Sequence, residues 1–120
     1  MENSNIILTN GLLQQYSKIN SDYNLVGSFL LSDITIYPNP VISILNINIL
    51  YPDSGYYHLA LFDIIGQKLK EVKLDNGGMI ISEEWNLGGL PAGSYILNIR
   101  LISRTGRLMK KRAYKIFKLN

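Results

Sequence analysis

Apolar and polar residues alternate along most of the chain after Ile34, which is the pattern of β-strands with one buried face. The clearest case is residues 95–101, where the apolar side chains alternate with Asn98 and Arg100. The pattern predicts a short first strand from Ile34, followed by strands near 45–49, 57–61, 67–74, 79–87, 95–101 and 108–119. The buried positions predict a core that includes Leu45, Ile47, Leu59, Leu61, Leu97 and Ile99.

Turn signals separate these segments at short intervals. Pro38 and Pro40 fix φ and remove two backbone donors, so residues 37–40 are expected to form a turn. Further turns are expected at 52–55, at 75–78, at 91–93, at 105–106, and at Gly66, where glycine permits a positive φ. About seven short strands with frequent turns predict an all-β fold, an immunoglobulin-like antiparallel β-sandwich.

The first thirty-odd residues have a different pattern. Asn10-Gly11 is a hairpin signal between two apolar segments, and polar residues follow it. We place the boundary near Ser32-Asp33, so that residues 1–33 form a linker or the remnant of an upstream region and residues 34–120 form the sandwich. Deletion of residues 1–31 is then expected to leave cooperative unfolding nearly unchanged.

Composition narrows the classes of function. A chain of 120 residues is long enough for one domain, and the absence of cysteine excludes disulfides, thiolate metal sites and a cysteine nucleophile. The net charge is only +3, but eight of the twelve basic residues occur from Arg100 onward and no Asp or Glu follows Glu84. Such a basic end could meet an acidic partner, nucleic acid or an anionic membrane, or could simply keep an edge strand soluble.

Catalytic candidates are few. His58 is the one histidine and lies in an expected strand, where a half-buried or surface role is commoner than catalysis. Glu83 and Glu84 are adjacent, so a strand would point them to opposite faces. The aspartates lie at turns, where they bond local backbone, and the glycine pairs lack a phosphate-loop lysine. We therefore expect no enzyme, no metal and no cofactor.

Other partners are also disfavoured. Tyr114 and Phe117 lie among basic residues and could stack nucleic-acid bases, but such interleaving is more often just a strand with one buried face. No apolar run approaches the roughly 20 residues needed to span a bilayer. Residues 1–5 show no basic region before an apolar stretch, so no secretory signal peptide is expected here. We expect a monomer that binds no nucleic acid and has no transmembrane segment.

Several motifs follow one another in a defined order toward the C-terminus. They are Tyr37-Pro38-Asn39-Pro40, Asp63-Ile64-Ile65-Gly66-Gln67, Leu90-Pro91-Ala92-Gly93-Ser94-Tyr95, and a last strand in which lysines alternate with apolar residues. In this order and spacing the segment from Ile34 to Asn120 resembles the type A C-terminal sorting domain of the type IX secretion system. The resemblance covers nearly the whole of the predicted sandwich.

The resemblance implies an export signal and no catalysis. It implies recognition of a fused cargo by an outer-membrane translocon of Bacteroidota-type bacteria, usually followed by removal of the domain by a sortase-like peptidase. It implies a secreted or cell-surface location, reached through the periplasm when the domain is joined to a signal peptide, which this sequence lacks. The sorting-motif residues are Tyr37, Pro38, Asn39, Pro40, Asp63, Gly66, Leu90, Pro91, Gly93, Tyr95, Lys110, Lys111, Lys115 and Lys118.

Two alternatives remain open at this point. The glycines and Tyr95 can be explained as fold devices, with the ring buried and the hydroxyl at the rim, and the lysines as either recognition residues or solvated edge charges. The chain could instead be an immunoglobulin-like accessory binding module. An exposed patch of aromatic residues, drawn from Tyr51, Tyr56, Tyr57 and Trp85, would favour that class.

Overall fold

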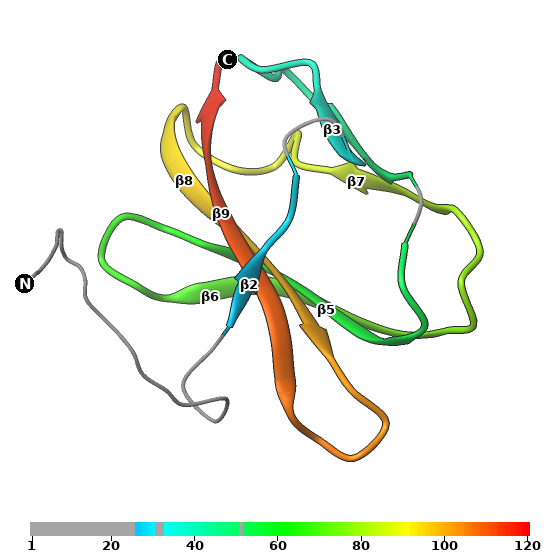
Figure 1. Cartoon of the computed structure of the whole chain (residues 1–120). Helices are drawn as coiled ribbons and strands as arrows, with labels where there is room; N and C mark the ends of the chain where they lie inside the picture. The colour runs from blue at the N-terminus through cyan, green and yellow to red at the C-terminus, as the bar shows by residue number, and fades with distance from the viewer. Residues whose placement is uncertain (1–25, 31–32, 51) are drawn as a thin grey trace, which may run out of the picture.

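The computed structural model describes residues 26–30, 33–50 and 52–120, and within them eight strands form two sheets (Figure 1). The strands are β2 (Gly27–Ser28), β3 (Ile34–Tyr37), β4 (Ile44–Ile49), β5 (Gly55–Phe62), β6 (Lys68–Asn76), β7 (Ile81–Asn86), β8 (Gly93–Ile102) and β9 (Leu108–Lys118). The larger sheet has the order β2-β9-β8-β5-β6, and the smaller has the order β3-β4-β7. The predicted all-β sandwich is confirmed.

The long strands pair with their neighbours in antiparallel fashion, as hairpins require. β8 and β9 form a long hairpin that pairs Gly93 with Lys118 at one end and Ile102 with Leu108 at the other. β5 pairs with both β6 and β8, so it is an interior strand of the larger sheet, and β8 lies at the centre. β2 is different, because it runs parallel to β9 and pairs only with Lys110 and Lys111.

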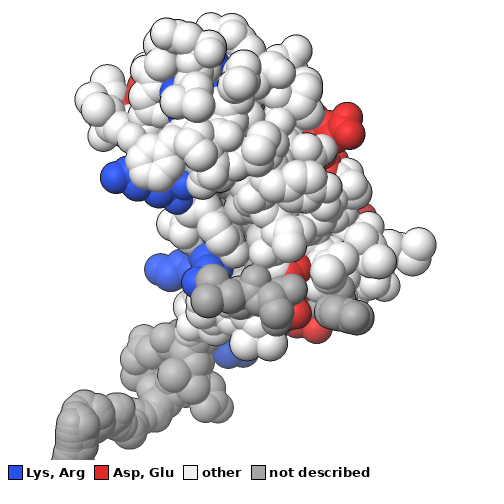
Figure 2. Space-filling model, turned by 90° about the horizontal axis from the view of Figure 1, so that it is seen from above, with Lys and Arg blue, Asp and Glu red and all other residues white. Residues whose placement is uncertain are grey.

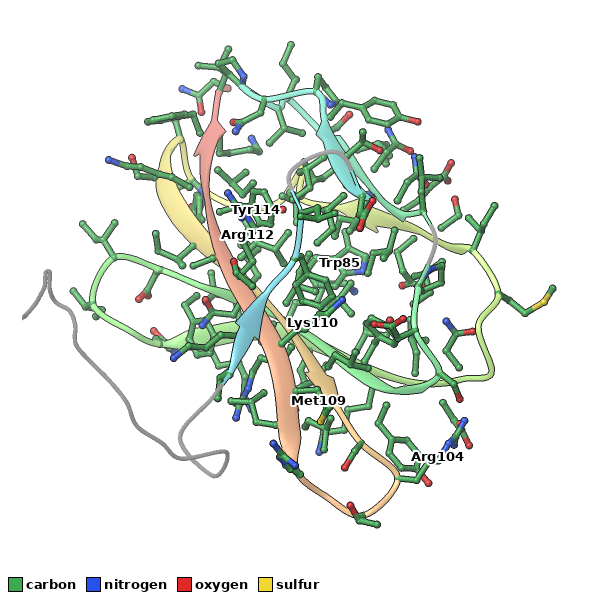
Figure 3. The ribbon with its side chains drawn as sticks, in the orientation of Figure 1. Trp85, Arg104, Met109, Lys110, Arg112 and Tyr114 are labelled. Carbon is green, nitrogen blue, oxygen red and sulfur yellow. The ribbon has the colours of Figure 1, made fainter. Side chains whose placement is uncertain are left out.

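The core lies between the two sheets and follows the predicted alternation. All six predicted core residues are fully buried, with no exposed side-chain surface. The structure adds Trp85 from the smaller sheet, Ile116 from β9 and Val41 from the segment before β4. Figure 3 shows Trp85 in the space between the sheets. Removing these apolar faces from water is the main force that holds the two layers together.

The structure corrects one prediction about the N-terminal part. Phe29, which precedes Ser32, is only 5% exposed and belongs to the core cluster. Its ring lies 6.3 Å from the ring of Tyr57, and its carbonyl oxygen accepts a 2.9 Å hydrogen bond from Arg112. The prediction that nothing before Ser32 joins the core is therefore wrong for Phe29. The hairpin signal at Asn10-Gly11 lies outside the described residues.

Two buried tyrosines bond backbone four residues upstream. The hydroxyl of Tyr57 donates to the carbonyl of Asp53 at 2.8 Å, and that of Tyr95 donates to the carbonyl of Pro91 at 2.5 Å. Both rings are buried, so each hydroxyl satisfies its hydrogen bond at the rim of the core. This arrangement fixes the turns before β5 and β8 to the strands that follow them.

Tyr57 makes stability depend on pH in the alkaline range. Burial raises the pKa of Tyr57 from its ordinary value of 10.0 to about 12. The folded state therefore holds the phenolic proton more tightly than the unfolded state does. The contribution of protonated Tyr57 to stability is complete below pH 10 and is lost as pH rises toward 12. We expect the wild type to lose about 2 kcal/mol more stability than Tyr57→Phe across this window. Denaturant unfolding at several pH values measures the difference, and parallel curves for the two proteins would contradict it.

The aromatic patch of the alternative binding module does not form. Tyr57 and Trp85 are 0% and 1% exposed, so neither can reach a partner. Tyr56 lies on the opposite face of β5 and is exposed, with the Arg104 guanidinium 4.9 Å from its ring centre. Tyr51 lies outside the described residues. The observation that would have favoured a glycan- or surface-binding module is therefore missing from the described part of the chain.

Candidate functional site

The end of β9 is held on one side by the segment that follows β3. The Asn39 side chain donates to the carbonyl of Lys115 and accepts from the amide of Phe117, both at 2.9 Å. Val41 then continues the contact, because its amide donates to the Phe117 carbonyl and its carbonyl accepts from Leu119, both at 2.8 Å. Asn39 of the Pro-Asn-Pro motif and Val41 just after it thus bond the edge of β9 from 115 to 119.

The Leu90-to-Tyr95 motif holds the other side of the same strand end. Gly93 pairs with Lys118, and Tyr95 pairs with Ile116. Gly93 has a φ of 151°, a backbone conformation that residues other than glycine rarely adopt. We call residues 39–42, 93–95 and 115–119 the C-terminal platform. Figure 1 shows the C-terminus beside the segment between β3 and β4, next to the start of β8.

The Asp63-to-Gln67 motif forms the turn between β5 and β6 near this end. The Asp63 carboxylate accepts hydrogen bonds from the amides of Ile65 and Gln67, at 3.1 and 2.8 Å. Gly66 has a φ of 91°, which makes it the turn residue that the sequence predicted. Phe62, just before the turn, pairs with Ile96 of β8. The three turn motifs therefore lie at the end of the sandwich where β9 finishes.

The four motif lysines do not share one surface. Lys111 and Lys115 are exposed on the outer face of the larger sheet. Lys110 points to the inner face, where it forms a 2.9 Å ion pair with Asp53 and lies 5.8 Å from the ring centre of Phe29. Figure 3 shows Lys110, Arg112 and Tyr114 along β9, in the region of β2.

Lys118 corrects the interpretation of these lysines as solvated edge charges. It is only 4% exposed, and its ammonium donates to the carbonyl of Leu119 at 2.5 Å. Its aliphatic stem therefore fills the inner face beside Val41, with which it pairs in the edge contact. Lys118 has a packing role that its residue type did not predict.

The surface of the platform is apolar on its solvent side. Ile42 and Leu119 directly follow the bridged residues Val41 and Lys118, so their backbones lie close together at this end of β9. They are 60% and 49% exposed, and Phe117 is 43% exposed. Exposed apolar residues are normal singly, but neighbours grouped at one end of a domain indicate a contact surface.

The polar groups near the sheets are engaged in structural contacts. His58 meets the carboxylate of Glu71, which also accepts a hydrogen bond from Lys68 at 3.0 Å. The bonds from Lys68 and His58 lower the pKa of Glu71. Glu83 accepts from the indole of Trp85 at 3.2 Å, so it too serves the fold. Among the described residues, no three His, Cys, Asp or Glu side chains cluster as metal ligands would.

Comparison with known proteins identifies the family. The sequence model of the secretion system C-terminal sorting domain matches residues 35–115, which is more than half of the chain. The chain therefore belongs to this family, and the resemblance to type IX sorting domains is confirmed. The family is one of sorting signals and is not an enzyme family. No curated protein matches the chain. In the described parts of the chain, no helix has the length and apolar character to cross a membrane.

Proposed function

We propose that this domain directs a fused cargo protein through the type IX outer-membrane translocon, and that the translocon contacts the C-terminal platform. The family match supports a sorting role. The observation that carries the assignment of the surface is the position of the motifs. Asn39, Val41, Gly93 and Tyr95 all bond or pair with the final residues of β9. A receptor that binds this platform therefore recognises the C-terminal end of the domain in its folded form.

We further propose that the domain acts as a monomer without catalytic function and that a sortase-like peptidase removes it after transport. Cargo would then be released or retained at the cell surface of a Bacteroidota-type bacterium. The fold supports separate sites for translocon recognition and for cleavage by the peptidase. The platform lies at the C-terminal end of β9, while β2 lies near the other end of that strand. A folded platform can therefore be held while the chain upstream of β2 is cut.

A reporter fusion tests the proposed function. Residues 26–120 behind a signal peptide and a fluorescent reporter should carry the reporter out of a type IX-competent cell. We start the fusion at residue 26 so that it keeps Phe29, which is buried in the core cluster. Mass determination of the exported reporter will show whether the domain has been removed. Equal secretion of the reporter with and without the domain would reject the sorting assignment.

The placement of the lysines defines the variant that tests their role. Changing all four to glutamine is a poor test, because Lys118 is buried and Lys110 is paired with Asp53. Lys111 and Lys115 are exposed, so Lys111→Gln with Lys115→Gln should change the melting temperature by little. If these charges contribute to recognition, export of the folded double variant should fall. Unchanged export would assign the two lysines to solubility alone, while leaving the platform in place.

A further inference from the structure

A row of basic residues crosses the outer face of the larger sheet. The pairing register aligns Ser28 with Lys111, Lys111 with Arg100, Arg100 with His58, and His58 with Lys73. β9, β8, β5 and β6 each contribute one basic residue and β2 contributes Ser28, and the side chains of paired residues point to the same face. Neighbouring strands lie about 5 Å apart, so the points at which these side chains leave the backbone are close together. We call the four basic residues Lys111, Arg100, His58 and Lys73 the basic row; Ser28 extends it by one polar side chain.

Among the described residues, His58 is the one member of the basic row that meets a carboxylate, that of Glu71. Arg100, Lys111 and Lys73 form no ion pair or side-chain hydrogen bond with any residue in the described ranges. Glu71 also pairs with Lys68, and the carboxylate of Asp75 pairs with Arg104, which is outside the row. In the view of Figure 2 the blue basic side chains lie toward one side and the red acidic ones mainly toward the other. Like charges directly opposite one another are unfavourable, so a bound anion would stabilise this face.

A hollow of about 650 Å³ lies at one end of the row, between β2, β9 and β8. Arg100 and Lys111 line it together with the polar side chains of Ser28 and Asn98. Arg112 reaches it from the edge of β9, where one of its nitrogens already bonds Phe29 and Ser28. A guanidinium has five donors, so Arg112 keeps further donors, and the Arg100 fork is wholly available. The hollow therefore combines two free cations with neutral hydrogen-bond partners.

We propose that this hollow binds a phosphate group through Arg100 and Lys111, with Ser28 and Asn98 as neutral partners. The planar fork of Arg100 suits bidentate contact with phosphate oxygens, and the ammonium of Lys111 adds a point charge beside it. The group could be part of a soluble phosphate compound or of a phospholipid head group, because both present the same oxygens. The site is separate from the C-terminal platform and does not rest on the proposed sorting function.

Titration of the full chain with phosphate probes tests the site. Inorganic phosphate and tripolyphosphate should shift the amide resonances of residues 28, 98–100 and 111–113 in a saturable manner, with sodium chloride holding the ionic strength constant. Lys111→Gln and Arg100→Gln should each weaken binding about tenfold or more. Lys115→Gln is the matched control, because it removes the same charge from the same face of β9 but does not line the hollow. Its affinity should stay close to that of the wild type.

A second arm distinguishes the two sources of phosphate. Vesicles of phosphatidylcholine containing phosphatidic acid should retain the chain if the head group can enter the hollow, and Lys111→Gln should release it while Lys115→Gln should not. Binding of soluble phosphate without vesicle retention would assign the site to a soluble ligand. Equal weakening by Lys111→Gln and Lys115→Gln would show only a general charge effect and overturn the proposal. The proposal also fails if neither soluble phosphate nor the vesicles bind.

Discussion

Replacing Phe29 with alanine is expected to lower the free energy of unfolding by about 3–5 kcal/mol, the usual loss for a buried phenylalanine. Phe29 is 5% exposed, packs beside Tyr57, and lies under the ammonium of Lys110. A domain of this kind has a total stability of about 5–15 kcal/mol, so the variant loses a large share of it. Deleting residues 1–31 should destabilise the domain comparably, in contrast to the expectation from the sequence alone.

Leu30→Ala is the matched control for this prediction. Leu30 is adjacent to Phe29 but 66% exposed, so its truncation should change stability by about 0.5 kcal/mol or less. Denaturant unfolding of the three proteins gives the comparison directly. If Phe29→Ala and Leu30→Ala were both close to the wild type, residues 26–30 would contribute little to stability, as a domain boundary near residue 33 predicts.

The sandwich could be predicted because its strands carry their own pattern. Leu45 and Ile47, or Leu97 and Ile99, alternate with polar residues, and this period of two directly defines the buried face. Phe29 could not be predicted in the same way. β2 has only two residues, shows no alternation, and pairs in parallel with a strand more than eighty positions later. Nothing local in the sequence indicates such a distant partner.

The platform was predicted in part. The sequence identified its motifs as turns, but it gave no sign that Asn39 bonds the backbone of β9 across the two sheets. For Lys118, the strand period predicted a buried position, but its residue type predicted an exposed one. It shares the phase of Tyr114 and Ile116 along β9, which places it on the inner face, but a lysine is rarely buried. The residue type predicted an exposed side chain, whereas the strand period correctly predicted a buried one.

Changing Ile42 and Leu119 together to serine is expected to abolish export of a fused reporter while the domain stays folded. The two side chains are exposed neighbours on the platform, whereas the bonds that hold β9 there are made by backbone and by Asn39. Substitutions at exposed positions usually change stability by about 0.5 kcal/mol or less. An apolar contact of two such side chains with a receptor contributes about 1.5–3 kcal/mol each when fully buried, which is enough to lower affinity by several orders of magnitude.

Met79→Ser with Ile80→Ser supplies the matched control for this loss of export. These residues are 75% and 65% exposed, but they precede β7 at the end of the sandwich away from the platform. The control should therefore be exported like the wild type, although it removes as much exposed apolar surface. Thermal unfolding confirms that both double variants are folded, and the reporter is assayed in the medium and in the periplasm. If both variants lost export equally, the translocon would respond to general surface character, and the platform would not be its contact site.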